Sequence, residues 1–355
     1  MALGLAVLGA AAVGTFCGAG VARRPFAPAP LAESALARSL AERDPEPARR
    51  ALDVLRERLR STPLDSATRT ITASLLAETA TIPADKDTAA RQAQDAVRLT
   101  PSDDGVARGA AGVLARCGRT DVALRDISAM FAFDPGAAAA ALADIEPFVA
   151  AERLEEGLPA SAAAWLAWYE RLRASGRTEA AAARLAALLQ RWPSDLPAIA
   201  AAASVAAGRG RVDEVARLVP PSMELPATAA AAPLHAYRAQ TKAAAGDAAG
   251  ARADARRAIA LSNDDPSVLM LAGDALLATE AALARDFWNR ALHILLAKPA
   301  TRDRAVWVRY RLARLDDREG RAGDALRAWR SILAERPNDG EATRRIAELT
   351  GEVHR

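Results

Sequence analysis

Four residues near the end of the chain are of types that commonly dominate protein–protein interfaces. Trp307, Tyr310, Arg314 and Arg318 follow one another at intervals of three or four residues, so a helix would place them on one face. Aromatic and arginine side chains are enriched among the residues that carry most of the binding energy of an interface. This spacing predicts a partner-binding patch. A second interpretation stays open, in which Trp307 and Tyr310 pack in the core while the arginines are solvated.

Residues that could bind a metal ion or perform catalysis show no comparable grouping. Three histidines (His235, His293, His354) and two cysteines (Cys17, Cys117) are scattered, without a CxxC or HExxH motif. No GxxxxGK[ST] phosphate loop occurs, and no serine lies in a nucleophile-elbow glycine pattern. We therefore expect no catalytic residues, no metal site and no cofactor, and we predict that the chain is not an enzyme.

The composition indicates which elements must position these residues. Hydrophobic residues make up 51% of the 355 residues but aromatic residues only 4%, because most of the apolar content is alanine. Alanine has the highest helix propensity and fills little volume. No convincing alternating strand pattern is present, so an all-α fold is predicted. The net charge is only +3 and the two signs are interleaved, which disfavours nucleic-acid binding.

The stretch GRAGDALRAWRSILAERPND (320–339) has a spacing that recurs along the chain. In it, Gly320 is followed by Ala325, then Trp329, then Pro337. Upstream stretches repeat the order with Gly118, Ala123, Ile127 and Pro135, with Gly176, Ala181, Leu185 and Pro193, and with Gly246, Ala251 and Ala255, whereas segment 265–298 has Thr279 in the glycine position but keeps Ala284 and Trp288. A glycine can adopt the left-handed conformation of a tight turn, and an alanine lets two helices approach closely. The large residue four positions later lies on the same helix face and fills the gap to the next helix pair.

These residues resemble the tetratricopeptide repeat (TPR) family. First helices are predicted to begin near residues 70, 104, 162, 196, 232, 265 and 306, and two of the intervals equal the family's period of 34. The resemblance implies a right-handed superhelical solenoid of antiparallel helix pairs over residues 31–355, with about eight partly degenerate repeats and a C-terminal capping helix. It also implies a protein or peptide partner in the concave groove. The lysines and asparagines of the chaperone-binding carboxylate clamp are absent.

The start of the chain has a different character. Residues 2–22 contain no charge and would span roughly 30 Å as a helix, so residues 1–22 are predicted to be an N-terminal apolar helix that acts as a transmembrane anchor or signal segment. Arg23 and Arg24 follow, within a Pro-rich linker at 23–30. The side of the membrane on which the solenoid lies stays open between cytoplasm and periplasm.

Two glycines in this apolar segment bear on assembly and location. Gly14 and Gly18 form a small-xxx-small pair that would allow two such helices to dimerise. The excess of arginine and alanine indicates a GC-rich bacterial genome, and with the apolar segment it predicts a bacterial single-pass inner-membrane protein.

The function that follows is a non-enzymatic interaction scaffold, tethered to a membrane. The resemblance associates such proteins with envelope or exopolysaccharide assembly. Two alternatives stay open: an RNA-binding helical-repeat protein, which would need a basic groove, and an enzyme whose site lies in an irregular segment at 137–161, 220–231 or 298–305.

Overall fold

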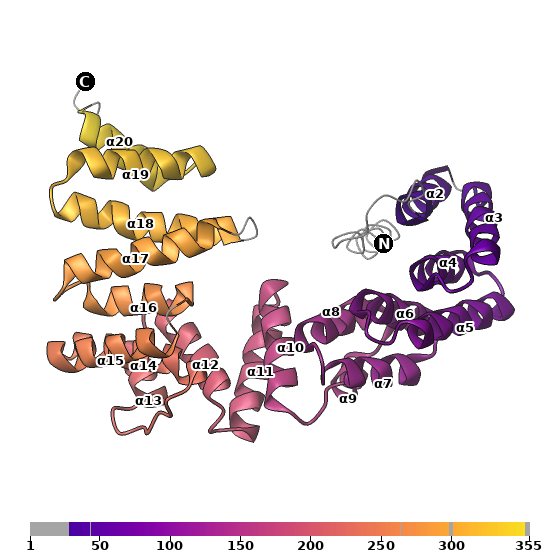
Figure 1. Ribbon diagram of the computed structural model, residues 1–355, viewed down its shortest axis with the longest axis horizontal. Helices are drawn as coiled ribbons and strands as arrows, with labels where there is room; N and C mark the ends of the chain where they lie inside the picture. Colours follow the sequence, from indigo (N-terminus) through magenta and orange to yellow (C-terminus); the bar gives the residue numbers. More distant parts are fainter. Residues whose placement is uncertain (1–27, 43, 263, 298–300, 352–355) are drawn as a thin grey trace. The chain divides into compact units, whose positions relative to one another are not determined.

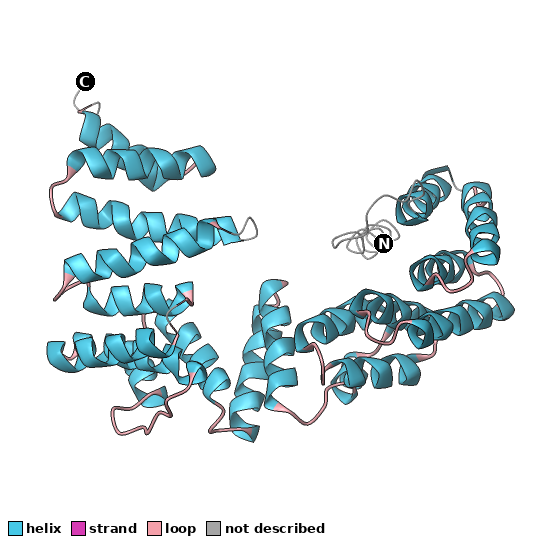
Figure 2. Cartoon of the chain, in the orientation of Figure 1, coloured by secondary structure: helices cyan, strands magenta, loops and turns pink. Residues whose placement is uncertain are grey.

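The computed structural model describes residues 28–42, 44–262, 264–297 and 301–351. Within these ranges the chain forms nineteen α-helices, two short 3₁₀ helices and no strand (Figure 2). The prediction of an all-α chain is confirmed. The right-handed superhelical course stays a prediction.

The chain divides into two compact units, residues 1–188 and 189–355, and each is described by itself. The helices of the first unit are α2 (Pro28–Glu42), α3 (Glu46–Ser61), α4 (Ser66–Thr79), α5 (Pro83–Leu99), α6 (Asp104–Arg116), α7 (Thr120–Met130), α8 (Pro135–Ile145), η2 (Glu146–Phe148), α9 (Ala151–Glu156), α10 (Ala162–Ala174) and α11 (Thr178–Arg191), the last of which contains the boundary. Consecutive helices pack in pairs (α2 with α3, α4 with α5, α6 with α7), and the first helices of successive pairs also touch (α2 with α4, α4 with α6, α6 with α8).

The second unit continues the same scheme (Figure 1). Its helices are α12 (Leu196–Gly208), α13 (Val212–Leu218), η3 (Ala229–Ala231), α14 (Ala232–Ala244), α15 (Ala248–Leu261), α16 (Pro266–Leu276), α17 (Ala281–Leu296), α18 (Arg302–Arg318), α19 (Ala322–Glu335) and α20 (Gly340–Thr350). Here α12 packs with α13, α14 with α15, α16 with α17 and α18 with α19, and α20 covers the last pair. We call the first helix of each pair helix A and the second helix B.

The recurring glycine–alanine spacing has the structural role that the sequence predicts. Gly320 lies between α18 and α19 with φ +70°, and Ala325 and Trp329 of α19 are fully buried. The other turn glycines of the pattern also have positive φ (Gly118, Gly176, Gly246), and the other alanines of the pattern are buried (Ala123, Ala181, Ala251, Ala284). The predicted starts of the first helices lie within four residues of the observed ones.

The segments that fit the pattern poorly contain shortened second helices. Helix α9 has six residues and α13 has seven, whereas α19 has fourteen. Pro220 and Pro221 come after the C-cap residue Val219 of α13. A proline cannot donate the backbone hydrogen bond that a longer helix would need, so α13 ends here. At the other end of the chain, α2 begins at Pro28, inside the stretch predicted to be a linker.

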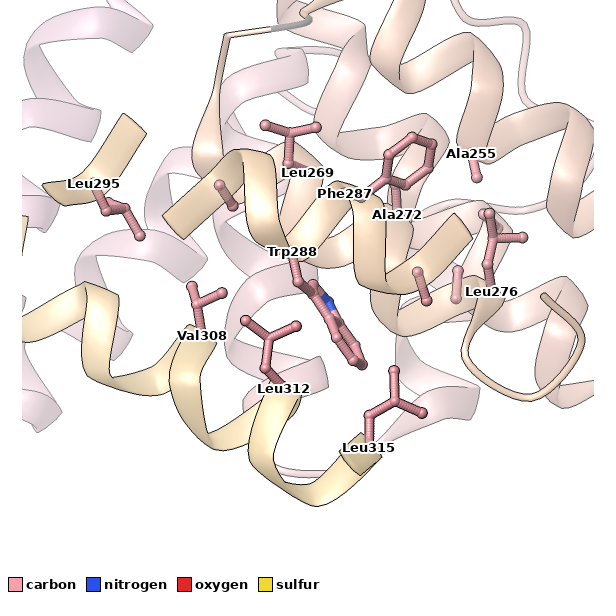
Figure 3. Packing of buried hydrophobic residues seen from close by; sticks show 14 of the residues in the cluster. Ala255, Leu269, Ala272, Leu276, Phe287, Trp288, Leu295, Val308, Leu312 and Leu315 are labelled. Atoms are coloured by element: carbon pink, nitrogen blue, oxygen red, sulfur yellow. The ribbon is translucent and has the colours of Figure 1, made fainter. Parts of the chain in front are cut away.

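Helices of one pair come close where a side chain is missing. A methyl group added at Gly273 of α16 would overlap Nε1 of Trp288 in α17 and lie 3.1 Å from the carbonyl oxygen of Ala284. The indole nitrogen of Trp288 donates to the carbonyl oxygen of Met270 at 3.3 Å. The indole of Trp288 thus fills the space that Gly273 leaves on the surface of α16, beside Leu312 and Leu315 of the next pair (Figure 3).

Many of the interleaved charges pair between neighbouring repeats. Arg311 of α18 forms two hydrogen bonds to Asp274 of α16, at 2.6 and 2.9 Å, and so joins two A helices. Further contacts between A helices are Arg108–Asp144 and Arg116–Glu78, and contacts along the B-helix side are Arg119–Asp87, Arg153–Asp121, Arg184–Glu155 and Arg252–Glu280. The interleaved charges of the sequence therefore connect successive repeats.

The predicted localisation as a single-pass inner-membrane protein is contradicted. Across the described ranges, no helix combines the length and the apolar character that a bilayer crossing requires. Residues 2–22, with Gly14 and Gly18, on which the anchor and the dimer were predicted, lie outside the described residues.

The close contact at Gly273 gives a stability prediction. Replacing Gly273 with Ala should lower the free energy of unfolding by about 1–3 kcal/mol, because the methyl group forces Trp288 to move. In the control, Gly323→Ala in α19, no atom lies near the added methyl group, and helix propensity should raise stability by up to about 1 kcal/mol. Urea unfolding followed by circular dichroism measures both. Equal changes of the same sign would contradict the packing described here.

Candidate functional site

Helix α18 has one buried side and one exposed stripe. Ala305, Val308, Leu312 and Leu315 face the packed interior with α16 and α17. Arg304, Trp307, Arg311, Arg314 and Arg318 recur at spacings of three and four residues on the other side, and all except the half-buried Arg311 are exposed. We call these five residues the α18 stripe.

Tyr310 does not belong to this stripe. The residue is 7% exposed, and its ring meets the ring of Trp329 edge-on, with centroids 5.6 Å apart. The hydroxyl group donates to the carboxylate of Asp339. Burial, together with the neighbouring Asp339 carboxylate, raises the pKa of Tyr310 to about 12, so the hydroxyl stays protonated and remains a donor.

Asp339 connects this tyrosine to the capping helix. Its other carboxylate oxygen accepts from the backbone N–H of Ala342 at 2.9 Å, which caps the N-terminus of α20. The Tyr310 hydroxyl and this backbone N–H lower the pKa of Asp339. Tyr310 therefore anchors α18 to α19 and α20.

The predicted patch thus separates into parts with different roles. Arg314 forms a bidentate pair with Glu341 of α20, at 2.9 and 2.6 Å, and its guanidinium lies 5.8 Å from the Tyr310 ring centroid. Arg318 is exposed at the end of α18. Trp307 and Tyr310 have ring centroids 5.7 Å apart, yet only Trp307 reaches the surface. The structure therefore brings Trp307, Tyr310 and Arg314 together and leaves Arg318 farther along the helix.

Trp307 is the aromatic side chain that the site presents to solvent. It is 53% exposed, and the guanidinium of Arg336 lies 5.1 Å from its ring centroid. Arg304 donates to Ser267 of α16 at 2.7 Å. Arg304 and Arg311 were absent from the predicted patch although the same spacing would have included them. Arg336 lies in the loop after α19, and no spacing rule on α18 could have indicated it.

A buried charge cluster lies elsewhere in the second unit. Asp254 of α15 accepts two hydrogen bonds from Arg238 of α14, at 2.9 and 2.7 Å, and pairs with Lys242 at 2.8 Å. Nδ1 of His235 lies 3.1 Å from the same carboxylate. Arg238 also donates to the carbonyl oxygen of Met223 at 2.9 Å, which fixes the segment after α13.

The protonation states of this cluster suit a structural role. Burial alone would raise the pKa of Asp254, but hydrogen bonds from Arg238, Lys242 and His235 outweigh burial and lower that pKa to about 2. Burial lowers the pKa of His235, which favours the neutral ring. A permanently ionised carboxylate held by two cations is a poor proton acceptor, so this cluster does not offer a general base.

Nothing in the described ranges assembles a metal centre, since no three His, Cys, Asp or Glu side chains group suitably there.

Cys117 lines a hollow of about 510 Å³ together with Lys86, Asp87 and Arg119. Burial raises the pKa of this thiol, so it stays in the unreactive protonated form. A second hollow, of about 360 Å³, is lined by Trp165, Trp168 and Arg184 among others. Trp168 and Tyr169 are buried, as expected for core residues.

No family model and no curated protein sequence matches the chain. Similar solved structures include the APC/C hetero-tetramer Cut9–Hcn1, at 13% identity and a TM-score of 0.46, where the match covers 85% of this chain and 59% of that one. The C-terminal part of a TPR repeat-containing protein from Cytophaga hutchinsonii matches at 13% identity and a TM-score of 0.31. That match covers 78% of this chain and 99% of the other. Yeast Tom70 matches at 12% identity and a TM-score of 0.36, and the match covers 97% of this chain and 69% of Tom70. The helix pairs of this chain carry the fold assignment by themselves.

The Asp254 cluster predicts a specific pH dependence of stability. The folded pKa of Asp254 lies below its ordinary value, so the ionised carboxylate stabilises the fold above about pH 4, and this contribution is lost as the pH falls toward about 2. Asp254→Asn should therefore lower the free energy of unfolding at pH 7 by about 3–5 kcal/mol, because Arg238 and Lys242 lose their partner.

Urea unfolding of wild type and variant at a series of pH values measures this effect, and the difference between them should shrink as the pH falls below about 4. Asp264→Asn, at an exposed position, serves as control and should change the free energy of unfolding little at any pH of the series. A difference for Asp254→Asn that stays constant down to about pH 2 would contradict the assignment.

Proposed function

We propose that this protein is a non-enzymatic scaffold that binds a protein partner on the α18 stripe, at Trp307, Arg314 and Arg318. Tyr310, which the sequence grouped with them, supports this surface from beneath. The observation that carries the proposal is the exposure of Trp307, at 53%, on a helix whose opposite side is packed in the core.

An exposed tryptophan next to arginines has the composition of an interface hot spot. Trp307 lies on a regular helix beside the buried Tyr310, and Arg336 lies close to its ring. Such a side chain has little freedom left to lose on binding, which lowers the entropic cost of association. An aromatic side chain on a helix therefore loses less entropy on binding than the same side chain on a mobile loop would, which supports a binding surface at Trp307.

The remaining charged groups support a scaffold rather than an enzyme. The buried carboxylate of Asp254 is held by Arg238 and Lys242, and the thiol of Cys117 is protonated. The Asp254 carboxylate beside His235 is already neutralised by these two cations, and a protonated thiol is a weak nucleophile. Envelope or exopolysaccharide assembly remains part of the proposal only through the family resemblance.

Photocrosslinking in the cells that produce the protein tests the proposal. The photoreactive residue p-benzoylphenylalanine replaces Trp307 in one variant of the full chain and the exposed Arg330 of α19 in a control. We expect a discrete protein adduct at position 307 and none at position 330, with the adduct identified by mass spectrometry. The same adducts at both positions, no adduct, or an adduct only with nucleic acid would contradict the proposal.

A further inference from the structure

The α18 stripe carries arginines that differ in how their charge is balanced. Arg311 pairs with Asp274 and Arg314 pairs with Glu341. Arg304 donates to the neutral hydroxyl of Ser267, and Arg336 lies against the ring of Trp307. In the described ranges, no carboxylate lies at ion-pair distance from Arg304, Arg318 or Arg336. Arg336 is balanced in part by the nearby Asp339 carboxylate. Arg304 and Arg318 are therefore the two arginines of the α18 stripe that have no carboxylate partner in the described ranges.

We infer that the partner segment bound here is an acidic peptide with an apolar side chain that packs on Trp307. This inference rests on the proposed function. Carboxylates of the segment pair with Arg304 and Arg318, while the guanidinium of Arg336 lies over the ring of Trp307. Arginine suits this task because its planar guanidinium is weakly hydrated and binds carboxylates in a bidentate manner.

The length of the stripe sets the length of the segment. Arg304 and Arg318 are fourteen positions apart on one helix, which corresponds to roughly 21 Å at the helical rise. An extended chain covers this distance with about six or seven residues. Trp307 lies one turn from Arg304, so the apolar residue belongs near one acidic end and the second acidic group near the other. An acidic heptapeptide therefore matches the stripe.

The carboxylates already present on this surface distinguish a peptide from a continuous polyanion. Asp274 and Glu341 flank the stripe between Arg304 and Arg318. A nucleic-acid backbone carries a charge at every step and would meet these carboxylates. A peptide can place its acidic side chains at the ends and neutral residues between them. Arg304 and Arg318, the arginines without a carboxylate partner, lie at the two ends of the stripe, with the paired Arg311 and Arg314 between them. This arrangement favours a segment with separated carboxylates.

Fluorescence anisotropy with the full chain tests the inference. The probe is the fluorescein-labelled peptide Glu-Gly-Phe-Gly-Gly-Gly-Glu, and its neutral counterpart has glutamine in place of both glutamates. We expect the acidic peptide to bind about tenfold more tightly than the neutral one, and its affinity to fall as salt rises from about 50 to 300 mM.

Variants locate the effect. Arg318→Glu and Arg304→Glu should each weaken acidic-peptide binding at least about fivefold, whereas Arg330→Glu on α19 should change it less than about twofold. Trp307→Ala should weaken both peptides. All of these substitutions are at exposed positions. Circular dichroism tests whether each variant is folded.

Several outcomes would overturn the inference. These are equal affinity for the two peptides, no saturable binding of the acidic peptide, an equal effect of Arg330→Glu, or tighter binding of single-stranded oligouridylate that Arg318→Glu abolishes. A protein adduct at position 307 together with equal peptide affinities would leave the scaffold proposal standing and reject only the acidic partner. Absence of any protein adduct would reject the scaffold proposal itself.

Discussion

Close approach of helices at residues without a large side chain is the constraint on which the rest of the structure depends. Ala325, Ala284 and the bare backbone at Gly273 allow the two helices of a pair to approach until tryptophans of the second helix fill the space between pairs. Alanine-rich helices form readily but bury little volume each, so one pair cannot make a core by itself. Stacking on neighbours supplies the missing burial. The cluster around Trp288 accordingly includes residues from three successive pairs. Both helices of the pairs α14–α15 and α16–α17 contribute, and the third pair contributes through α18.

Charge pairs add specificity to this apolar stacking. Arg311–Asp274 and Arg108–Asp144 join A helices of neighbouring repeats through bidentate contacts, whose fixed geometry favours this alignment of the helices. These pairs are only partly buried, and ion pairs that water still reaches contribute little stability individually, on the order of 0–1 kcal/mol. The buried cluster at Asp254 is different, because loss of the carboxylate would leave two cations without a partner. It fixes the position of the segment that follows the shortened α13.

The sequence indicated the parts of the fold that depend on local spacing. Gly320, Ala325 and Trp329 lie within ten positions of one another, and their spacing predicted the turn, the close contact and the buried bulky residue. The Tyr310–Asp339 hydrogen bond joins residues 29 positions apart on different elements, and no local pattern reports such a contact. Local spacing has the same limit at the candidate site. Trp307 and Tyr310 are neighbours on one helix, and only the position of α19 decides that Tyr310 is covered and Trp307 is not.

Hydrogen exchange of the full chain carrying Ala325→Leu, read by mass spectrometry against wild type, tests the central claim most directly. A leucine at this fully buried position separates α18 from α19. If stability arises from stacking of neighbours, protection should fall most in α18 and α19, less in α17 and α20, and not at all in α14. An equal loss of protection in every helix, or no loss in α18, would contradict the account.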